Sequence, residues 1–225
     1  MTECAIVPLA HADELVAATA EVAGEAPLVR VVRSLLGAVA EEGVVVATVP
    51  EMAAGVRACL RAAGLATAVA VAQVAGSRSQ VIVAGLEYLG AQRDTSSFVL
   101  IGDHRYPLSP AEVADRVLVA MGQGHDVVVP ILAVTDTVKT VDERGRVLST
   151  VDRATLRTVQ FPRGFTASAL WRLASTATSE DVDEFDAALR AGLDIGTVAG
   201  DANGFRAELP RDARLLDAVI GSRRD

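Results

Sequence analysis

Residues 97–134 read SFVLIGDHRYPLSPAEVADRVLVAMGQGHDVVVPILAV, and their pattern gives the clearest indication of the fold class. It begins with one short apolar run, SFVLIGD, and ends with another, DVVVPILAV, both typical of buried strands. Between them, 109–124 has helical spacing, and Ser109 as N-cap with Pro110 at the first helical position predicts where the helix begins. The order strand, helix, strand indicates a βαβ unit with parallel strands.

The same alternation extends in both directions along the chain. Strands that are apolar along their whole length belong in a parallel sheet with helices on both faces. The predicted fold class is therefore α/β, with a doubly wound, mostly parallel sheet. Further strands are expected at 5–9, 44–49, 67–74, 157–161 and 194–200, and helices at 28–42, 50–64, 78–92, 164–177, 182–191 and 210–221.

One segment, 138–153 (VKTVDERGRVLSTVDR), departs from this pattern. Its two β-prone runs flank the turn-forming residues 142–145, which predicts a hairpin that is too polar for the core. We expect an arm that projects from a single domain spanning 1–225. Its apolar positions need a surface to pack on, and a second copy is the simplest candidate because two-fold dimers are the commonest oligomers.

Composition excludes two classes of partner. The formal net charge is -8, the isoelectric point is about 4.9, and no run of Lys or Arg offers a surface for nucleic acid. No apolar run approaches the roughly 18 to 20 residues that span a bilayer, and the first residues lack a basic leader followed by a hydrophobic run. We therefore expect a cytoplasmic protein that binds neither nucleic acid nor membrane.

Candidate site residues follow the predicted strands, because ligands of open parallel sheets bind outside the carboxyl ends of the strands. Residues 8–10 follow the first strand, and Asp103 follows the fourth. Thr137 and Lys139 follow the fifth, and Lys139 is the only lysine in the chain. Two interpretations of Lys139 stay open: a site residue, or a remnant in a composition that favours arginine.

Several motifs resemble the 2-C-methyl-D-erythritol 4-phosphate cytidylyltransferase family over nearly the whole chain. VTDTVK paired with VDRATLRTVQFPR is the most specific of them, because the intervening stretch corresponds to the dimer arm of that family. The resemblance implies a single nucleotidyltransferase domain, 1–225, that uses the arm at 138–153 to form a homodimer. The other motifs are AIVP at 5–8, VLIGDHRYP at 99–107 and DVDEFDAALRAGLDIGTVAGDANGFRAELPRD at 181–212.

The resemblance also implies substrates and roles. CMP would pass from CTP to the phosphate of 2-C-methyl-D-erythritol 4-phosphate, a small phosphorylated polyol. Thr137 and Arg153 would bind that phosphate, with Arg153 supplied by the partner subunit and Lys139 close by, since a guanidinium makes bidentate contacts to phosphate. Asp103 would hold Mg²⁺. Arg206 is the candidate for the role of the family's catalytic lysine, one position out of register, and the expected nucleotide-binding residues are Pro8, Leu9, Ala10, Gly76, Arg78, Gly85 and Asp103.

The chain departs from the family where the triphosphate would bind. The family has a glycine-rich loop of the form AAGxGxRM, whose amides and cations stabilise the transition state. Here residues 9–28 read LAHADELVAATAEVAGEAPL, with neither Arg nor Lys, which predicts an amphipathic helix. Tyr106 also replaces an arginine of the family pattern. We expect cytidylyltransferase activity that is weak or lost, unless Arg78, Arg105 or Arg206 assumes the missing cationic roles.

Two other functions remain open at this point. One is a catalytically silent homologue that binds a phosphorylated ligand or a partner subunit. The other is a transferase that uses another nucleotide donor, because a fold does not determine a function. Structural interpretations also compete with the site assignments: Asp103 as a strand-end cap, and Arg153 with Asp152 as an ordinary surface pair.

Overall fold

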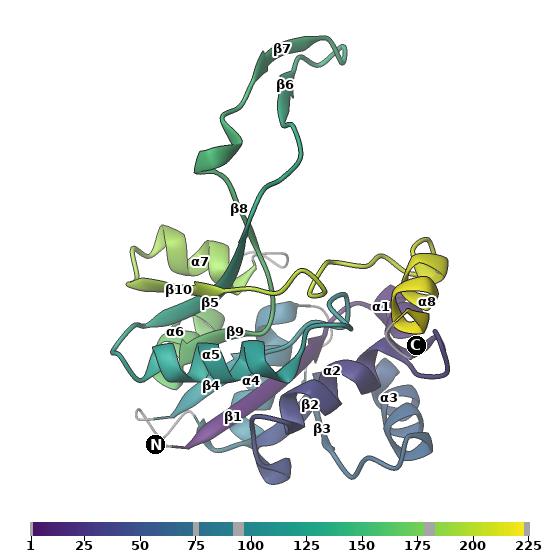
Figure 1. The fold of residues 1–225 in the computed structure, drawn as a ribbon. Coiled ribbons are helices and arrows are strands. Elements are labelled where there is room, and N and C mark those ends of the chain that lie inside the picture. The colour runs from purple at the N-terminus through teal and green to yellow at the C-terminus, as the bar shows by residue number, and fades with distance from the viewer. Residues whose placement is uncertain (1, 74–76, 92–96, 178–182, 223–225) are drawn as a thin grey trace.

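A computed structural model describes residues 2–73, 77–91, 97–177 and 183–222 (Figure 1). Its main sheet has the strand order β10-β5-β9-β4-β1-β2-β3, and β8 pairs with β5. The strands are β1 (Glu3–Leu9), β2 (Val44–Thr48), β3 (Ala68–Val71), β4 (Phe98–Ile101), β5 (Val127–Ala133), β8 (Arg157–Val159), β9 (Arg163–Thr166) and β10 (Ile195–Ala199).

The centre of the sheet is parallel and buried on both faces. β1 pairs in parallel with β2 and β4, and β2 pairs in parallel with β3. Burial of every residue from Cys4 to Leu9 explains why this strand is apolar along its length, without alternation. The predicted α/β fold with a mostly parallel sheet is confirmed; β8 and β9 are its antiparallel members.

Helices cover both faces of the sheet (Figure 1). One layer, containing α4 and α6, packs on β1–β4 and β9, and α7 packs against α6. The opposite layer contains α2, α3 and α5, while α1 packs on α2 and α3. The bounds are α1 (Ala12–Thr19), α2 (Pro27–Leu36), α3 (Pro50–Ala62), α4 (Arg78–Tyr88), α5 (Ala111–Met121), α6 (Ala167–Ser175), α7 (Glu184–Arg190) and α8 (Ala213–Gly221), with short 3-10 turns η1 (Glu41–Gly43) and η3 (Arg153–Thr155).

The structure corrects several expected boundaries and adds a strand. Pro110 is the N-cap of α5, and the Ser109 hydroxyl instead donates a hydrogen bond to the Phe161 carbonyl at 2.7 Å. The helix expected to reach residue 42 ends at Leu36. The region expected to begin a helix at 164 forms β9, which inserts antiparallel between β4 and β5 before α6 starts.

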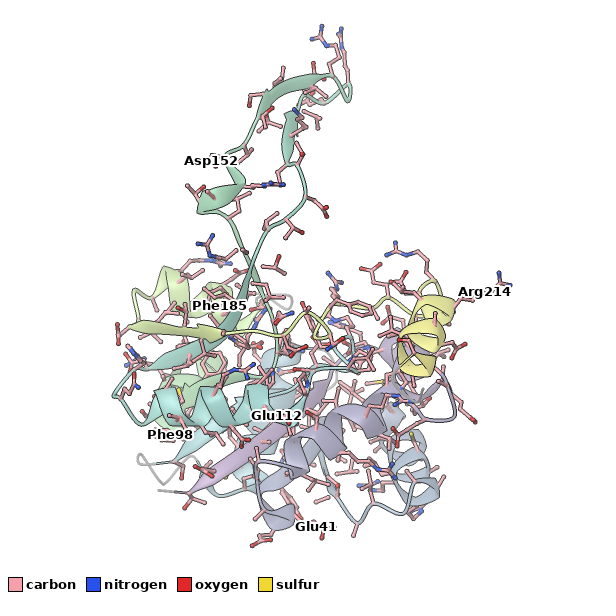
Figure 2. The ribbon with its side chains drawn as sticks, in the orientation of Figure 1. Glu41, Phe98, Glu112, Asp152, Phe185 and Arg214 are labelled. Atoms are coloured by element: carbon pink, nitrogen blue, oxygen red, sulfur yellow. The ribbon has the colours of Figure 1, made fainter. Side chains whose placement is uncertain are left out.

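The segment 138–153 stands away from the main sheet (Figure 1). β6 (Lys139–Val141) and β7 (Val147–Thr150) pair antiparallel in a sheet of their own. Figure 2 places Asp152 on this arm, well clear of the helices. Val141, Val147 and Leu148 are 56%, 63% and 65% exposed, so its apolar side chains pack on little within the chain.

Within the described ranges, none of the helices combines the length and apolar composition needed to cross a membrane.

Candidate functional site

The candidate site lies where β1 and β4 end and β9 begins. β1 and β4 are parallel neighbours, so their carboxyl ends share one edge of the sheet. Ile101, the last residue of β4, is in register with Arg163, the first residue of β9. The topology therefore brings Asp103, just after β4, to the same edge as Arg163.

Asp103 is buried and fully engaged by Arg105. Its Oδ1 accepts hydrogen bonds from the backbone N–H and Nε of Arg105, both at 2.9 Å, and its Oδ2 accepts from Nη2 at 2.5 Å. Burial alone would raise the pKa of Asp103, but the hydrogen bonds and charge of Arg105, with the charge of Arg78, hold it well below its usual range. Asp103 is thus an ionised carboxylate whose two oxygens already have donors.

A second buried ion pair joins Arg78 to Glu184. Arg78 lies at the start of α4, and its Nε and Nη2 donate to the two carboxylate oxygens of Glu184 at 2.8 and 3.1 Å. The side chains of Arg78 and Glu184 are only 14% and 4% exposed. Burial would raise the pKa of Glu184, but the charge and hydrogen bonds of Arg78 and the charge of Arg163 lower it. The pair is bidentate, which is the strongest geometry for these groups.

Arg163 extends this network from β9. Its Nη1 donates to Oδ1 of Asp183 at 2.5 Å and lies 3.8 Å from Glu184. The guanidinium carbon lies 4.0 Å from the centre of the Phe161 ring, which is cation–π distance. Three guanidinium groups and three carboxylates therefore balance one another at this edge of the sheet, and each of these arginines has an acidic partner.

The helix predicted within residues 9–28 forms over part of that segment. α1 spans Ala12–Thr19, and the carboxylate of Glu14 accepts hydrogen bonds from the backbone N–H groups of Ala10 and His11 at 2.7 and 2.9 Å. Pro8 and Leu9 are buried in β1. The amides that follow β1 consequently donate to an acidic side chain of the same chain.

The C-terminal segment that contains Ala207 and α8 packs against the residues that follow β4 and α1. The Ala207 N–H donates to the Arg105 carbonyl at 2.7 Å. Leu216 and Ile220 of α8 form a second small core with Val22, which follows α1. His104 is 5% exposed and lines a small cavity with Ala207 and Leu209 of this segment, and burial lowers its pKa despite the charge of Asp103.

The predicted acceptor-phosphate residues lie elsewhere, on the arm or, for Thr137, directly before it. Thr137, Lys139 and Arg153 are all exposed. Lys139 Nζ donates to the Thr150 hydroxyl at 2.6 Å, and the Arg153 guanidinium donates to the Thr135 carbonyl. Within the part of the chain that the structure describes, neither cation forms an ion pair with a residue of the Asp103 and Glu184 networks.

Three other predicted residues have separate environments. Arg206 is exposed and pairs with Glu208 at 3.1 Å. Gly85 is a packing position, since an added Cβ would lie 2.9 Å from Cγ2 of Ile6 in β1. Gly76 lies outside the described residues.

Sequence reasoning identified Asp103 but missed two other acidic side chains at this edge of the sheet, Glu14 and Glu184. The role of Glu14 could have been predicted, because the side chain of a glutamate at the third helical position commonly accepts a hydrogen bond from the backbone N–H of the N-cap residue. Glu184 pairs with Arg78 across 106 positions, and a single sequence gives no signal for such a contact.

The side chains do not form a preassembled metal site. The described residues contain no group of three or more His, Cys, Asp or Glu side chains arranged to hold an ion. The one carboxylate expected to bind Mg²⁺, Asp103, has both oxygens directed at Arg105. A cation would have to displace that guanidinium.

Known proteins resemble this chain in sequence and in fold. Residues 11–222 match the family described as 2-C-methyl-D-erythritol 4-phosphate cytidylyltransferase. A protein of that name from Rhodococcus jostii is 34% identical over 201 residues, covering 89% of this chain and 84% of the relative. One from Frankia casuarinae is 36% identical over 161 residues, covering 67% of this chain and 59% of the relative.

Solved structures give the same answer for the fold. The crystal structure of 2-C-methyl-D-erythritol 4-phosphate cytidylyltransferase from Thermus thermophilus superposes with a TM-score of 0.73. It is 25% identical in sequence, and the match covers 98% of this chain and 100% of that one.

Proposed function

The chain belongs to the 2-C-methyl-D-erythritol 4-phosphate cytidylyltransferase family, and from that premise we propose that it is a cytidylyltransferase-like protein with weak or lost activity. The reaction at issue is transfer of CMP from CTP to 2-C-methyl-D-erythritol 4-phosphate. In that reaction the acceptor phosphate attacks the α-phosphorus, and pyrophosphate leaves.

The observation that carries this proposal is the neutralised network at the carboxyl edge of the sheet. Charge that develops on a transferring phosphoryl group is stabilised by cations already aimed at it. Arg78, Arg105 and Arg163 are aimed at Glu184, Asp103 and Asp183 instead. Recruiting Arg78 or Arg105 would leave the buried carboxylate of Glu184 or Asp103 without its main partner, which is strongly unfavourable.

The segment after β1 supports the same proposal. Backbone N–H groups beside a helix N-terminus are suited to phosphate, but those of Ala10 and His11 donate to Glu14. The next cation along the chain, Arg30, lies 3.3 Å from Glu25. A triphosphate entering here would meet carboxylates where the family pattern has glycine amides and cations.

Magnesium binding stays a prediction that this proposal does not require. Mg²⁺ is commonly held by one or two carboxylates together with substrate phosphates. Because Arg105 occupies both oxygens of Asp103, we derive no step that uses the metal.

The acceptor side supports an alternative role, a silent homologue that binds a phosphorylated ligand or a partner subunit. Arg153 on the arm and Thr137 directly before it are exposed, and the exposed apolar side chains of Val141, Val147 and Leu148 are suited to contact with a second subunit. We propose a homodimer formed through this arm, with 138–153 as its dimerisation element within a single domain.

The test is pyrophosphate release from CTP and methylerythritol phosphate in the presence of Mg²⁺. The Thermus thermophilus relative serves as the positive control, and ATP, GTP and UTP replace CTP in parallel reactions. We expect release at least 10² to 10³ times slower than from the relative, since loss of a single preorganised donor typically costs that much. CTP turnover equal to that of the relative, and abolished by Arg153→Ala, would overturn the proposal. Release with another nucleotide would favour a different donor.

A further inference from the structure

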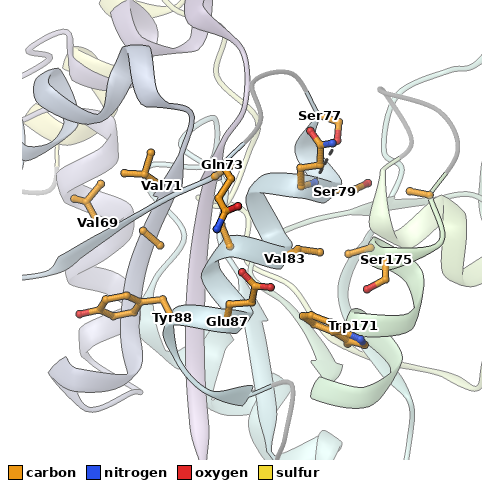
Figure 3. A pocket seen from close by; sticks show the side chains of 16 residues that line it. Val69, Val71, Gln73, Ser77, Ser79, Val83, Glu87, Tyr88, Trp171 and Ser175 are labelled. Carbon is orange, nitrogen blue, oxygen red and sulfur yellow. Dashed lines mark hydrogen bonds between the residues drawn. The ribbon is translucent and has the colours of Figure 1, made fainter.

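A surface groove of about 870 Å³ lies outside the network described above (Figure 3). One wall is formed by β3 and the residues after it, the floor by α4, and the other wall by α6. Arg78 does not line it, because its guanidinium is directed at Glu184. The lining side chains labelled in Figure 3 are Val69, Val71, Gln73, Ser77, Ser79, Val83, Glu87, Tyr88, Trp171 and Ser175.

The first wall is the edge of a strand rather than a face of the sheet. β3 is the last strand in the order, with β2 as its sole neighbour there. Side chains alternate between the faces of a strand, yet all residues from Val69 to Gln73 line the groove. A continuous run of this kind can meet a groove only where the edge of the strand, and therefore its backbone, borders it.

The backbone of β3 presents hydrogen-bonding groups at this edge, on the side away from β2. Ala72 donates its N–H to the Thr48 carbonyl of β2 at 2.9 Å. The backbone N–H and C=O groups of successive residues point to alternate sides of a strand. Because the N–H of Ala72 points toward β2, the backbone groups of Val71 and Val69 point away from β2. The Val69 carbonyl accepts a long bond of 3.5 Å from Arg57, which agrees with that direction. Such an edge is a template for an added strand.

The floor supplies a charge and one aromatic ring, and the α6 wall supplies a second ring. Gln80, Val83, Ala84, Glu87 and Tyr88 recur at helical spacing and form one stripe of α4 along the groove. Figure 3 shows Glu87 between Tyr88 on the β3 side and Trp171 on the α6 side.

Among the lining residues that the structure describes, Glu87 is the one carboxylate, and neither Lys nor Arg occurs. None of the ion pairs among the described residues includes Glu87. A carboxylate flanked by aromatic rings attracts a guanidinium or ammonium group and repels phosphate.

We propose that this groove binds an extended peptide segment of a partner protein, which adds to the sheet beside β3 and places a basic side chain against Glu87. Backbone hydrogen bonds between the peptide and Val71 would supply affinity that does not depend on the peptide's sequence. The basic side chain of the peptide, placed against Glu87, would supply selectivity. This inference is independent of cytidylyltransferase activity.

The chain provides its own reporter for this test. Trp171 lines the groove and is the only tryptophan in the 225 residues, so intrinsic fluorescence reports on this wall alone. The probe is the peptide acetyl-Val-Arg-Val-Arg-Val-amide, titrated into the full chain. We expect a saturable change in Trp171 fluorescence and at least about tenfold weaker binding by Glu87→Gln. Glu51→Gln, on the exposed first turn of α3, is the matched control and should bind as the parent does.

Additional experiments distinguish strand pairing from simple binding of a cation. N-methylation of the peptide backbone should weaken binding, and Glu87→Lys should bind the peptide with glutamates in place of arginines. No saturable change, equal binding of the basic and acidic peptides by the parent, or equal binding of arginine amide would overturn the proposal. A fluorescence change with protein concentration alone would do so as well, because it would assign the groove to a second copy of this chain.

Discussion

Replacing Glu184 with glutamine should lower the free energy of unfolding by about 3–5 kcal/mol. The Glu184 side chain is 4% exposed, and its two oxygens accept both hydrogen bonds of the bidentate pair with Arg78. Glutamine preserves the volume but removes the charge and one acceptor oxygen. The Arg78 guanidinium, itself 14% exposed, would then lose its counter-charge inside the protein.

The magnitude follows from burial rather than from the number of ion pairs. Breaking a buried pair leaves an uncompensated charge, whereas an exposed pair contributes only about 0–1 kcal/mol. We expect the lower part of the range, because Asp103 and Asp183 also lower the electrostatic energy of Arg78. A loss of about 3 kcal/mol is a large share of the roughly 5–15 kcal/mol by which domains are stable.

Urea unfolding at pH 7 measures this loss, with Glu208→Gln as the matched control. Glu208 also pairs with arginine, but its side chain is 46% exposed, so that variant should lose less than about 1 kcal/mol. Arg78→Met combined with Glu184→Met should recover much of the stability, since it removes both charges. A loss below about 1 kcal/mol for Glu184→Gln would contradict the assignment of Arg78 to an internal ion pair, because Arg78 would then be free to serve a ligand.

Three other predictions concern packing, pH and assembly. Gly85→Ala should lower the thermal unfolding midpoint, with a cost of about 1–3 kcal/mol, since its Cβ would meet Ile6 at 2.9 Å; an unchanged midpoint would contradict this packing. The pKa of Asp103 is lower in the folded than in the unfolded chain, so its contribution to stability is present above about pH 4 and is lost as the pH falls through the folded pKa. Asp103→Asn should therefore flatten the acidic part of the curve of unfolding free energy against pH, measured by urea unfolding. An unaltered curve would contradict this role of Asp103. Deletion of 141–149 should yield monomers in sedimentation, whereas dimers of unchanged stability would exclude the arm as the dimer contact.

The sequence is most informative where structure depends on neighbouring residues. The apolar runs of β1, β2, β4 and β5 predict their own burial, and α1 follows from residues 9–28. β9 is missed because four residues, RGFT, carry no periodic pattern, and its place between β4 and β5 is set by pairing with residues far away in the chain.

The candidate site follows the same rule. Residues after the strand ends, such as Asp103, can be identified from the topology of parallel sheets. Their partners cannot, because the pairs of Arg78 with Glu184 and Arg163 with Asp183 join separate elements. The sequence therefore reveals which family cations are missing, but not that the remaining arginines are committed to internal carboxylates.

The central claim is that donors near the expected triphosphate position are already bound to internal carboxylates. The most direct test is nuclear magnetic resonance of the Ala10 and His11 amides and the Arg105 Nε–H during titration with CTP and Mg²⁺. These groups now donate to Glu14 and Asp103. Our account predicts that their resonances stay in place up to millimolar nucleotide. Saturable shifts of all three would mean that the triphosphate displaces the internal carboxylates, and would contradict the account.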